Sequence, residues 1–239
     1  MPEIRYQRVL LKLSGQILAG DEEHGISPAR LTTLVSDIHD IVEMGVQVGM
    51  VVGGGNIFRG SEAERLGMDR VNADHMGMLA TVINALALQD RLERGGLPTH
   101  VLSAIEMERL AEPYVRRTAV RHLENGHVVL MAGGTGNPCF TTDTAAVLRA
   151  IEIDAEVLLK ATRVEGVFTA DPITHPEAVF LEKVGYLRVI NEGLKVMDST
   201  AISLCMENDL PIIVFDINVK DNLKRVILGE KVGTLVGEG

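Results

Sequence analysis

Glycines, lysines and hydroxyl side chains follow four apolar runs of this 239-residue sequence. The four run ends are Lys12–Gly15, Gly53–Asn56, Gly133–Asn137 and Lys160–Thr162. Glycine lets backbone NH groups approach an anion closely, and a nearby cation adds the opposite charge. Because ligands bind where the carboxyl ends of parallel strands meet, the four ends together predict a site for phosphate groups.

Four charged side chains near these ends are candidates for chemistry. Lys12 could bridge a phosphoryl group during its transfer, or could reach solvent as an ordinary end-of-strand lysine. Arg59 could hold a phosphate with two parallel hydrogen bonds, or could be an exposed loop arginine. Asp143 could orient Lys12 and metal-bearing phosphates, or could only cap a helix. Lys160 could join them.

The glycine-rich loops fail the two familiar phosphate-binding templates. Residues 134–139 read GTGNPC and lack the last glycine of the dinucleotide fingerprint GxGxxG. Residues 55–61 read GNIFRGS and carry no lysine where a Walker A loop needs one. Neither a Rossmann dinucleotide site nor a P-loop is therefore predicted.

The composition is that of an ordinary globular protein, with 46% apolar and 23% charged residues. A net charge of −10, 3% aromatic residues and no tryptophan disfavour binding to nucleic acid or to an anionic membrane. Cys139 and Cys205 fit neither a disulfide framework nor a zinc spacing, so we expect reduced thiols and no metal ligands. The start MPEIRYQR shows no signal-peptide pattern, which predicts a cytoplasmic protein.

Apolar runs alternate with helical patterns along the whole chain, and this alternation predicts an α/β sandwich. The strands read as continuous apolar runs, so the sheet is expected to be mostly parallel and covered on both faces. Helices are predicted to begin near Ser27, Val71, Thr141, Ser199 and Asp221. The strands are expected at 9–13, 46–52, 99–103, 127–132, 155–160, 211–215 and 234–236. No linker divides the chain, so one domain spanning residues 1–239 is predicted.

The helix predicted over Val71–Arg94 is apolar nearly all round. A helix on the surface of a monomer shows a single apolar stripe, so this one is expected to lie inside the subunit or at a subunit interface.

Five stretches resemble the bacterial uridylate kinases of the amino acid kinase family: KLSG at 12, VVGGGNIFRG at 51, DRVNADHMGMLAT at 69, GTGNPCFTTDTAA at 134 and KATRVEGVFTADP at 160. The resemblance spans nearly the whole chain. It implies a three-layer α/β/α fold with an acceptor-side lobe at roughly 1–155 and an ATP-side lobe at roughly 156–239. It also implies transfer of the γ-phosphoryl group of MgATP to UMP, giving UDP and ADP in pyrimidine biosynthesis, by a homohexamer with GTP and UTP as effectors.

The same resemblance implies roles for individual residues, with Lys12, Arg59 and Asp143 as the catalytic group. The implied ATP-binding residues are Lys12, Leu13, Ser14, Gly15, Gly55, Arg59, Thr162, Phe168 and Asp171. The implied UMP-binding residues are Gly54, Asp74, Thr135, Gly136, Asn137, Pro138, Cys139, Phe140, Thr141 and Thr142. The segment Gly20, Asp21, Glu22, Glu23, His24 and Gly25 is expected to be an effector loop.

The chain departs from the family pattern at four positions. Phe168 stands where many relatives carry tyrosine, and it can pack on adenine but cannot donate a hydrogen bond. Cys139 stands where an aromatic residue is usual. His100 and His127 stand where GTP-activated members tend to carry arginines, and histidine is only partly charged near neutrality.

Two other functions fit parts of the sequence. One is a regulatory module of the same fold that senses nucleotides without chemistry, and the complete set Lys12, Arg59 and Asp143 argues against it. The other is a kinase of the same family that acts on a carboxylate or carbamate, and the GTGNP string weighs against it.

Overall fold

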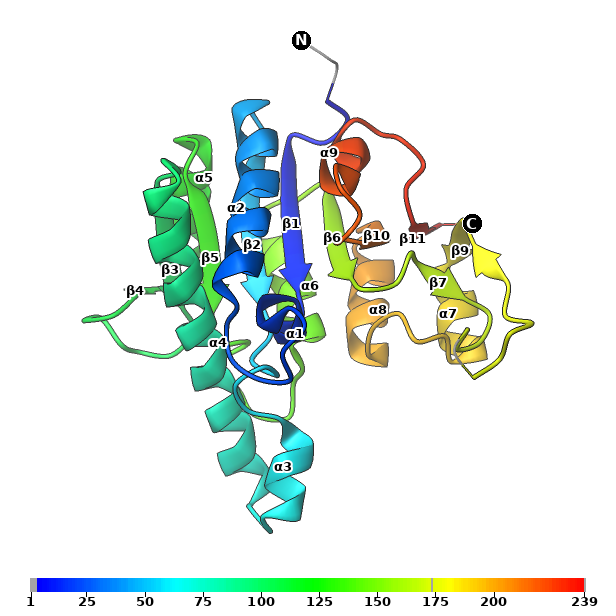
Figure 1. Cartoon of the computed structure of the whole chain (residues 1–239), viewed down its shortest axis with the longest axis horizontal. Coiled ribbons are helices and arrows are strands. Elements are labelled where there is room, and N and C mark those ends of the chain that lie inside the picture. Colours follow the sequence, from blue (N-terminus) through cyan, green and yellow to red (C-terminus); the bar gives the residue numbers. More distant parts are fainter. Residues whose placement is uncertain (1–3, 173, 239) are drawn as a thin grey trace.

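The computed structural model describes residues 4–172 and 174–238 (Figure 1). Within this part of the chain the centre is a nine-stranded sheet, parallel between all neighbours except β10 and β11. The strand order is β4 (Glu112–Pro113), β3 (Thr99–Ser103), β5 (Val128–Ala132), β2 (Gln47–Val52), β1 (Arg8–Leu13), β6 (Val157–Thr162), β10 (Ile212–Asp216), β11 (Thr234–Gly237) and β9 (Lys183–Gly185). A small antiparallel sheet pairs β7 (Val167–Phe168) with β8 (Phe180–Leu181).

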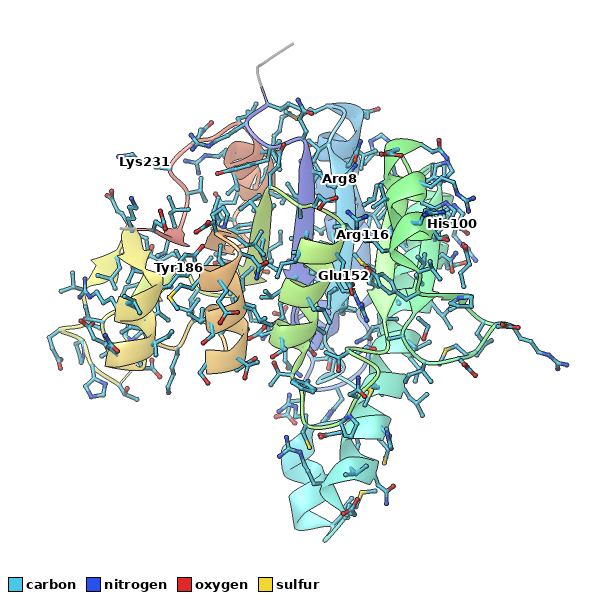
Figure 2. The ribbon with its side chains drawn as sticks, turned by 180° about the vertical axis from the view of Figure 1, so that it is seen from behind. Arg8, His100, Arg116, Glu152, Tyr186 and Lys231 are labelled. Carbon is cyan, nitrogen blue, oxygen red and sulfur yellow. The ribbon has the colours of Figure 1, made fainter. Side chains whose placement is uncertain are left out.

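Helices cover both faces of the central sheet. The helices of one face are α1 (Gly15–Ala19), α2 (Pro28–Glu43), α4 (Arg70–Arg94) and α9 (Asn222–Ile227). The helices of the other face, in front in Figure 2, are α5 (Arg116–Glu124), α6 (Thr142–Glu152), α7 (Tyr186–Glu192) and α8 (Ser199–Glu207). The short α3 (Gly60–Arg65) contacts α4 beyond the end of the sheet (Figure 1). This arrangement confirms the predicted three-layer α/β/α sandwich.

The central strand shows why the apolar runs are continuous. Leu11 of β1 packs into the core on the α2 side, whereas Leu10 packs into the core on the α6 side, and both side chains are fully buried. Successive strand residues point to opposite faces, so a strand covered on both faces needs apolar residues at consecutive positions.

The predicted helix starts are confirmed to within one residue. Ser27 caps α2 by accepting a hydrogen bond from the NH of Arg30, with Pro28 as the first helical residue. Asp69 caps α4 by accepting from the NH groups of Val71 and Asn72 at 3.0 and 3.2 Å.

Helix α4 is neither fully buried nor amphipathic in the usual way. Met78, Val82 and Leu88 lie in the core, but Leu79 and Ile83 are 49% and 50% exposed. The expectation of a helix buried inside one subunit is therefore wrong, because one apolar face lies open on this chain. The interface hypothesis stays a prediction.

The sequence missed the short elements α1, α3, α5, α7, β4, β7, β8 and β9. It also treated the last strand like the others, whereas β11 runs antiparallel to β10. Cys139 and Cys205 are both free, as expected, and burial raises the pKa of the Cys205 thiol to about 12. In the described ranges, none of the helices has the length and apolar character needed to cross a membrane.

Candidate active site

The four polar run ends lie side by side, as predicted. Strands β5, β2, β1 and β6 are consecutive neighbours in the sheet and run parallel, so their carboxyl ends share one edge. In Figure 1 this edge lies toward α1. The chain leaves β1 to form β2 on one side and later returns to form β6 on the other, which is the arrangement that opens a ligand crevice in parallel sheets.

A cluster of two lysines and one carboxylate occupies this edge. Lys12 and Lys160 are register partners on β1 and β6. The Lys12 Nζ lies 2.6 Å from Asp143 Oδ1, and the Lys160 Nζ lies 3.0 Å from Asp143 Oδ2. Lys160 also donates to the carbonyl oxygen of Val196. Both lysines are therefore held in place, which excludes the alternative in which Lys12 merely extends into solvent.

Burial and mutual charge set the protonation of the cluster. Burial alone would raise the pKa of Asp143, but the ammonium groups of Lys12 and Lys160 outweigh it and hold that pKa below its usual value. Burial, and then the charge of Lys12, lower the pKa of Lys160. With one carboxylate between two ammonium groups, the charged cluster carries a net positive charge that suits a phosphate.

Asp143 is not the cap of its helix. The cap of α6 is Thr141, whose hydroxyl accepts from the NH groups of Asp143 and Thr144 at 3.0 and 3.3 Å. The Asp143 side chain is thus left to pair with the lysines, and the capping alternative is wrong. Asp198 in turn accepts hydrogen bonds from the hydroxyls of Thr141 and Thr144, and so ties the start of α6 to the start of α8.

The glycine loop after β2 is fixed by a buried pair of asparagines. The side-chain amides of Asn56 and Asn84 donate to each other at 3.0 and 2.7 Å, and Asn84 also donates to the carbonyl oxygen of Gly53. A side chain at Gly54 would lie 2.7 Å from the backbone of Gly77 on α4, so this glycine is needed for close packing. Around Gly55 a side chain would meet nothing within 4 Å, so the loop is open on that side.

The predicted UMP-binding residues gather around one cavity of about 260 Å³. Its lining includes seven of them: Gly54, Asp74, Thr135, Asn137, Phe140, Thr141 and Thr142. Gly136 and Cys139 instead shape the loop, with φ of +78° and +70°. Glycine adopts this left-handed conformation without steric cost, whereas Cys139 adopts it against the preference of a side chain.

Two polar side chains of α4 hold the cavity loop in place. The hydroxyl of Thr81 accepts from the NH of Gly133 at 2.9 Å, and the carboxylate of Asp74 accepts from the NH of Cys139 at 2.7 Å. Arg70 lies 3.0 Å from the same carboxylate. The cavity wall is thus formed by the protein's own hydrogen bonds.

Arg59 links the glycine loop to the predicted effector segment. Its Nε donates to the carbonyl oxygen of Gly55 at 3.0 Å, and its Nη2 donates to the carbonyl oxygen of Glu23 at 3.2 Å. Gly25 lies against the same loop, since Asn56 donates to its carbonyl oxygen at 2.7 Å. Residues 21–25 are themselves exposed.

The predicted ATP-binding residues are spread over more elements. Ser14 and Gly15 stand at the start of α1, while the Thr162 hydroxyl at the end of β6 donates to the carbonyl oxygen of Val164. Phe168 lies in the small sheet and packs edge-on against Phe180, with ring centroids 5.5 Å apart. Asp171 follows in the loop between β7 and β8, where its carbonyl oxygen accepts from the NH of His175. The side chain of Leu13 is fully buried, so it belongs to the core.

A profile of the amino acid kinase family matches residues 7–216. The chain belongs to the amino acid kinase family. The crystal structure of a UMP kinase from Bacillus anthracis is 42% identical with a TM-score of 0.95, covering 98% of this chain and 96% of that one. A UMP kinase structure from Ureaplasma parvum is 37% identical with a TM-score of 0.92, covering 98% and 100%. A uridylate kinase structure from Archaeoglobus fulgidus is 27% identical with a TM-score of 0.75, covering 96% and 99%.

This amino acid kinase family member has three supporting residues that the sequence did not single out. Thr81 and Asn84 lie in the middle of α4, where a polar residue in an apolar helix is a signal of a buried hydrogen bond. Asp198 precedes α8 in the string Asp198–Ser199–Thr200, which reads only as a helix cap. Its second task, bonding to α6, depends on tertiary packing that no local pattern reveals.

Proposed function

We propose that this chain is a UMP kinase that transfers the γ-phosphoryl group of MgATP to UMP, giving UDP and ADP. The observation that carries the proposal is the buried Lys12–Asp143–Lys160 cluster next to the start of α6, whose first residues also line the glycine-walled cavity. The UMP kinase structures that match nearly the full chain at 37–42% identity support the same substrates.

The cavity of about 260 Å³ is the proposed UMP site. The hydroxyls of Thr141 and Thr142 stand at the N-terminus of α6, where free NH groups and the helix dipole favour an anion. A phosphate monoester has a second pKa of about 6, so the acceptor oxygen is already unprotonated near neutrality and needs no general base. The oxygen bonds to the γ-phosphorus of ATP as the bond from that phosphorus to the bridging oxygen of ADP breaks.

We propose that Lys12 contacts the phosphoryl group while it is transferred from ATP to UMP. Phosphoryl transfer depends on alignment and on neutralising charge on the equatorial oxygens, and a fixed ammonium group supplies both. Asp143 holds Lys12 in position through the 2.6 Å contact. Arg59 follows the glycine loop and is the second proposed cation.

The residues suit Mg²⁺ that arrives on the nucleotide. Asp143 is the carboxylate of the lysine cluster, and both of its oxygens are already paired with lysines. Mg²⁺ needs several oxygen ligands and commonly takes them from phosphates and water, with one or two carboxylates. When bound, the ion would neutralise charge on the ATP phosphates, and Asp143 would be the protein group beside it.

The donor nucleotide is proposed to lie on the side of β6 and the small sheet, contacting Ser14, Gly15, Thr162, Phe168 and Asp171. This placement of the donor is part of the proposed division of the chain into an acceptor-side lobe and an ATP-side lobe. The proposed effector role of segment 20–25 is supported by the contact between Glu23 and Arg59, since a ligand that moved the segment would also move the arginine. Regulation by GTP and UTP, the place in pyrimidine biosynthesis and the cytoplasmic location stay predictions.

A homo-oligomer is proposed from the exposed face of α4, and a hexamer is the specific form that the resemblance to uridylate kinases implies. Met76, Leu79 and Ile83 follow one another at helical spacing and are 38%, 49% and 50% exposed. Exposed apolar side chains grouped on one helix commonly mark an interface. Light scattering at micromolar concentration tests this, and a purely monomeric protein would contradict it.

The function is tested by an assay of ADP release with UMP, CMP, dUMP, aspartate, glutamate and carbamate as acceptors. We expect rapid turnover with UMP. Turnover with aspartate, glutamate or carbamate instead would favour a carboxylate or carbamate kinase. Binding of UTP or GTP without turnover of any acceptor would favour a regulatory module.

A further inference from the structure

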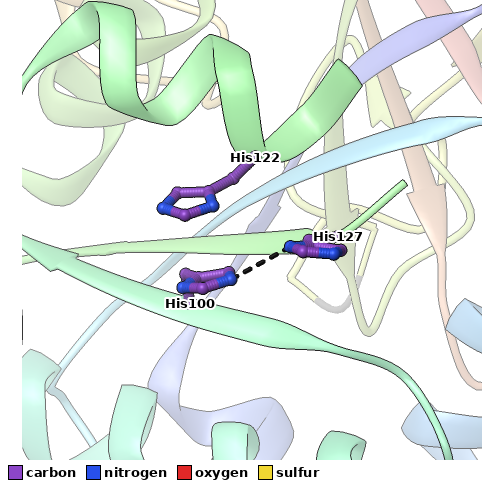
Figure 3. Close-up of side chains that lie close together, drawn as sticks. All are labelled: His100, His122 and His127. Atoms are coloured by element: carbon purple, nitrogen blue, oxygen red, sulfur yellow. Dashed lines mark hydrogen bonds between the residues drawn. The ribbon is translucent and has the colours of Figure 1, made fainter. Parts of the chain in front are cut away.

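Three histidines from separate elements lie close together near the edge of the sheet opposite to the proposed active site. His100 is the second residue of β3, His122 lies near the end of α5, and His127 immediately precedes β5 (Figure 3). His100 and His127 are thus at the amino ends of their strands, while the phosphate-binding loops follow the carboxyl ends. His100 is labelled near the outer edge of the molecule in Figure 2.

The three rings are close enough to share one ion. Each can offer a ring nitrogen such that all three nitrogens lie within 4.8 Å of one another. The Nε2 of His100 and the Nδ1 of His127 are 3.0 Å apart, and the rings of His100 and His122 stack with centroids 3.5 Å apart. Three nitrogens bound to a tetrahedral ion at about 2.0–2.1 Å are separated by about 3.3 Å. The stacked rings of His100 and His122 must turn out of their near-parallel arrangement so that the ion lies in the plane of each ring.

The chemistry and the partial exposure of the three rings suit a metal ion. A neutral imidazole is the form that binds a metal ion. The cluster is only partly buried, so an ion can reach it from solvent.

Glu112 of β4 orients two of the three rings. His100 Nδ1 lies 2.8 Å from Glu112 Oε1, and His122 Nε2 lies 3.3 Å from Glu112 Oε2. A carboxylate that accepts from His100 Nδ1–H leaves the lone pair of Nε2 pointing toward His127, and this carboxylate–histidine arrangement is common behind metal ligands.

We propose that His100, His122 and His127 form a binding site for a divalent first-row transition-metal ion of the Zn²⁺ class, with Glu112 as a positioning residue. Imidazole nitrogens suit Zn²⁺, Cu²⁺ and Ni²⁺, and three of them leave a fourth position for water or for a carboxylate. In the ion-free chain, His127 Nδ1–H donates to His100 Nε2 when Glu112 fixes the His100 tautomer. Binding through His127 Nδ1 therefore requires this proton to move to Nε2 of the same ring. In acid, an imidazolium ring must first lose a proton, so affinity falls as the pH is lowered.

Titration calorimetry with ZnCl₂ on the chelator-treated full chain tests the proposal. We expect one ion per chain, with tighter binding at pH 8 than at pH 6. The variants His122→Gln and His127→Gln are each expected to weaken binding at least about tenfold. The matched control is His39→Gln, which removes a partly exposed histidine that also faces a carboxylate, Glu43, at 3.7 Å. This control is expected to bind as tightly as the unchanged chain.

Co²⁺ substitution separates ligation from simple structural support. The visible spectrum of bound Co²⁺ is expected to show a tetrahedral site in the unchanged chain. In Glu112→Gln, Co²⁺ should still bind, but more weakly and with a shifted spectrum. In His127→Gln, the tetrahedral Co²⁺ spectrum should be lost. Circular dichroism checks that each variant is folded. Equal Zn²⁺ affinity in the unchanged chain and in folded His127→Gln, or no binding by either, would overturn the proposal. UMP kinase activity plays no part in this readout.

Discussion

The proposed acceptor cavity and the proposed donor side are built in different ways. The proposed acceptor loop at 135–142 is one continuous stretch. Asp74 of α4 accepts a hydrogen bond from its Cys139 NH, and Thr81 of α4 accepts one from Gly133 just before it. The donor residues come from α1, β6 and the small sheet, far apart in the sequence. The acceptor site is thus shaped before any ligand arrives, whereas the donor site depends on how separate elements are placed.

The Lys12–Asp143–Lys160 cluster stands where these two regions meet. Lys12 is the second-last residue of β1 and is one of the proposed donor residues, while Asp143 directly follows the proposed acceptor loop. The 2.6 Å contact between them therefore joins the two halves of the proposed reaction. If the comparison is right, changes in the cluster affect turnover, and changes on either side affect one substrate at a time.

The largest effects are expected from Lys12→Ala and Arg59→Ala. Loss of one fixed cation at a charge-developing transition state lowers kcat by about two to three orders of magnitude. Arg59→Ala is expected to cost at least as much, because arginines at phosphoryl transfer sites contribute about 10³–10⁵. Steady-state kinetics with UMP and MgATP measure both.

Lys231→Ala is the control for these variants, because Lys231 is an exposed lysine (Figure 2). It should leave kcat unchanged. Near-normal turnover in folded Lys12→Ala would remove the cluster from the reaction, and the comparison of two half-sites would lose its centre.

Asp143→Asn is expected to destabilise the fold as well as the reaction. Removing the carboxylate leaves two largely buried ammonium groups facing each other, and breaking a buried ion pair from one side costs about 3–5 kcal/mol. Urea unfolding at pH 7 measures the change. Asp90→Asn is the control, since it breaks an exposed pair with Arg94 and should cost under about 1 kcal/mol.

The difference in unfolding free energy between the unchanged chain and Asp143→Asn is expected to depend on pH in one direction. The folded-state pKa of Asp143 is lowered, so its contribution to stability is complete above the unfolded pKa of about 3.9 and is lost as pH falls further. The gap in unfolding free energy between the unchanged chain and Asp143→Asn should therefore narrow below about pH 4. A gap that widened in acid would contradict the assigned pairing.

Much of the fold could be predicted because its strands are buried on both faces. Continuous apolar runs such as Val9–Leu13 predict a central strand that is buried on both faces. Capping residues such as Ser27 and Asp69 mark the starts of helices. Although the missed helix α5 has nine residues, most of the missed elements are short: β4 and β7 have two residues each. Such pieces carry no periodicity, and their pairing is decided by neighbours distant in the sequence.

The part of the candidate site that lies on one continuous stretch of chain could be recognised from the sequence. The acceptor loop needs glycines at positive φ, so its chemistry is visible in the letters GTGN. The pairing of Asp143 with both lysines required the register of β1 and β6, and the meeting of His100, His122 and His127 required the packing of α5 on the sheet. Neither follows from spacing along the chain.

Gly136→Ala is expected to act on the acceptor alone. Gly136 has φ of +78°, and an added Cβ would lie 3.0 Å from the carbonyl oxygen of Ala104, so the cavity loop must shift. We expect KM for UMP to rise about tenfold, equivalent to about 1.4 kcal/mol, with little change in KM for ATP. Steady-state kinetics with each substrate varied in turn measure this.

Gly126→Ala is a closely matched control for that variant. Gly126 has nearly the same φ, +77°, and lies in the turn before β5 with nothing within 4 Å of an added Cβ. In both variants an alanine must adopt the left-handed backbone conformation, which destabilises the fold by about 1–2 kcal/mol. If Gly126→Ala raised KM for UMP equally, the effect of Gly136→Ala would reflect general destabilisation and not the cavity.

The smallest effect is expected from Phe168→Tyr on the donor side. Phe168 is partly buried against Phe180, and a hydroxyl at its ring edge adds a hydrogen-bond donor that phenylalanine lacks. One such bond contributes about 0.5–1.5 kcal/mol, so KM for ATP should fall by at most about tenfold while KM for UMP stays unchanged. Phe180→Tyr, in the facing strand of the same small sheet, is the control and should change neither constant. A shift in KM for UMP with Phe168→Tyr would place this residue on the acceptor side, and the separation of the two half-sites would then fail at the small sheet.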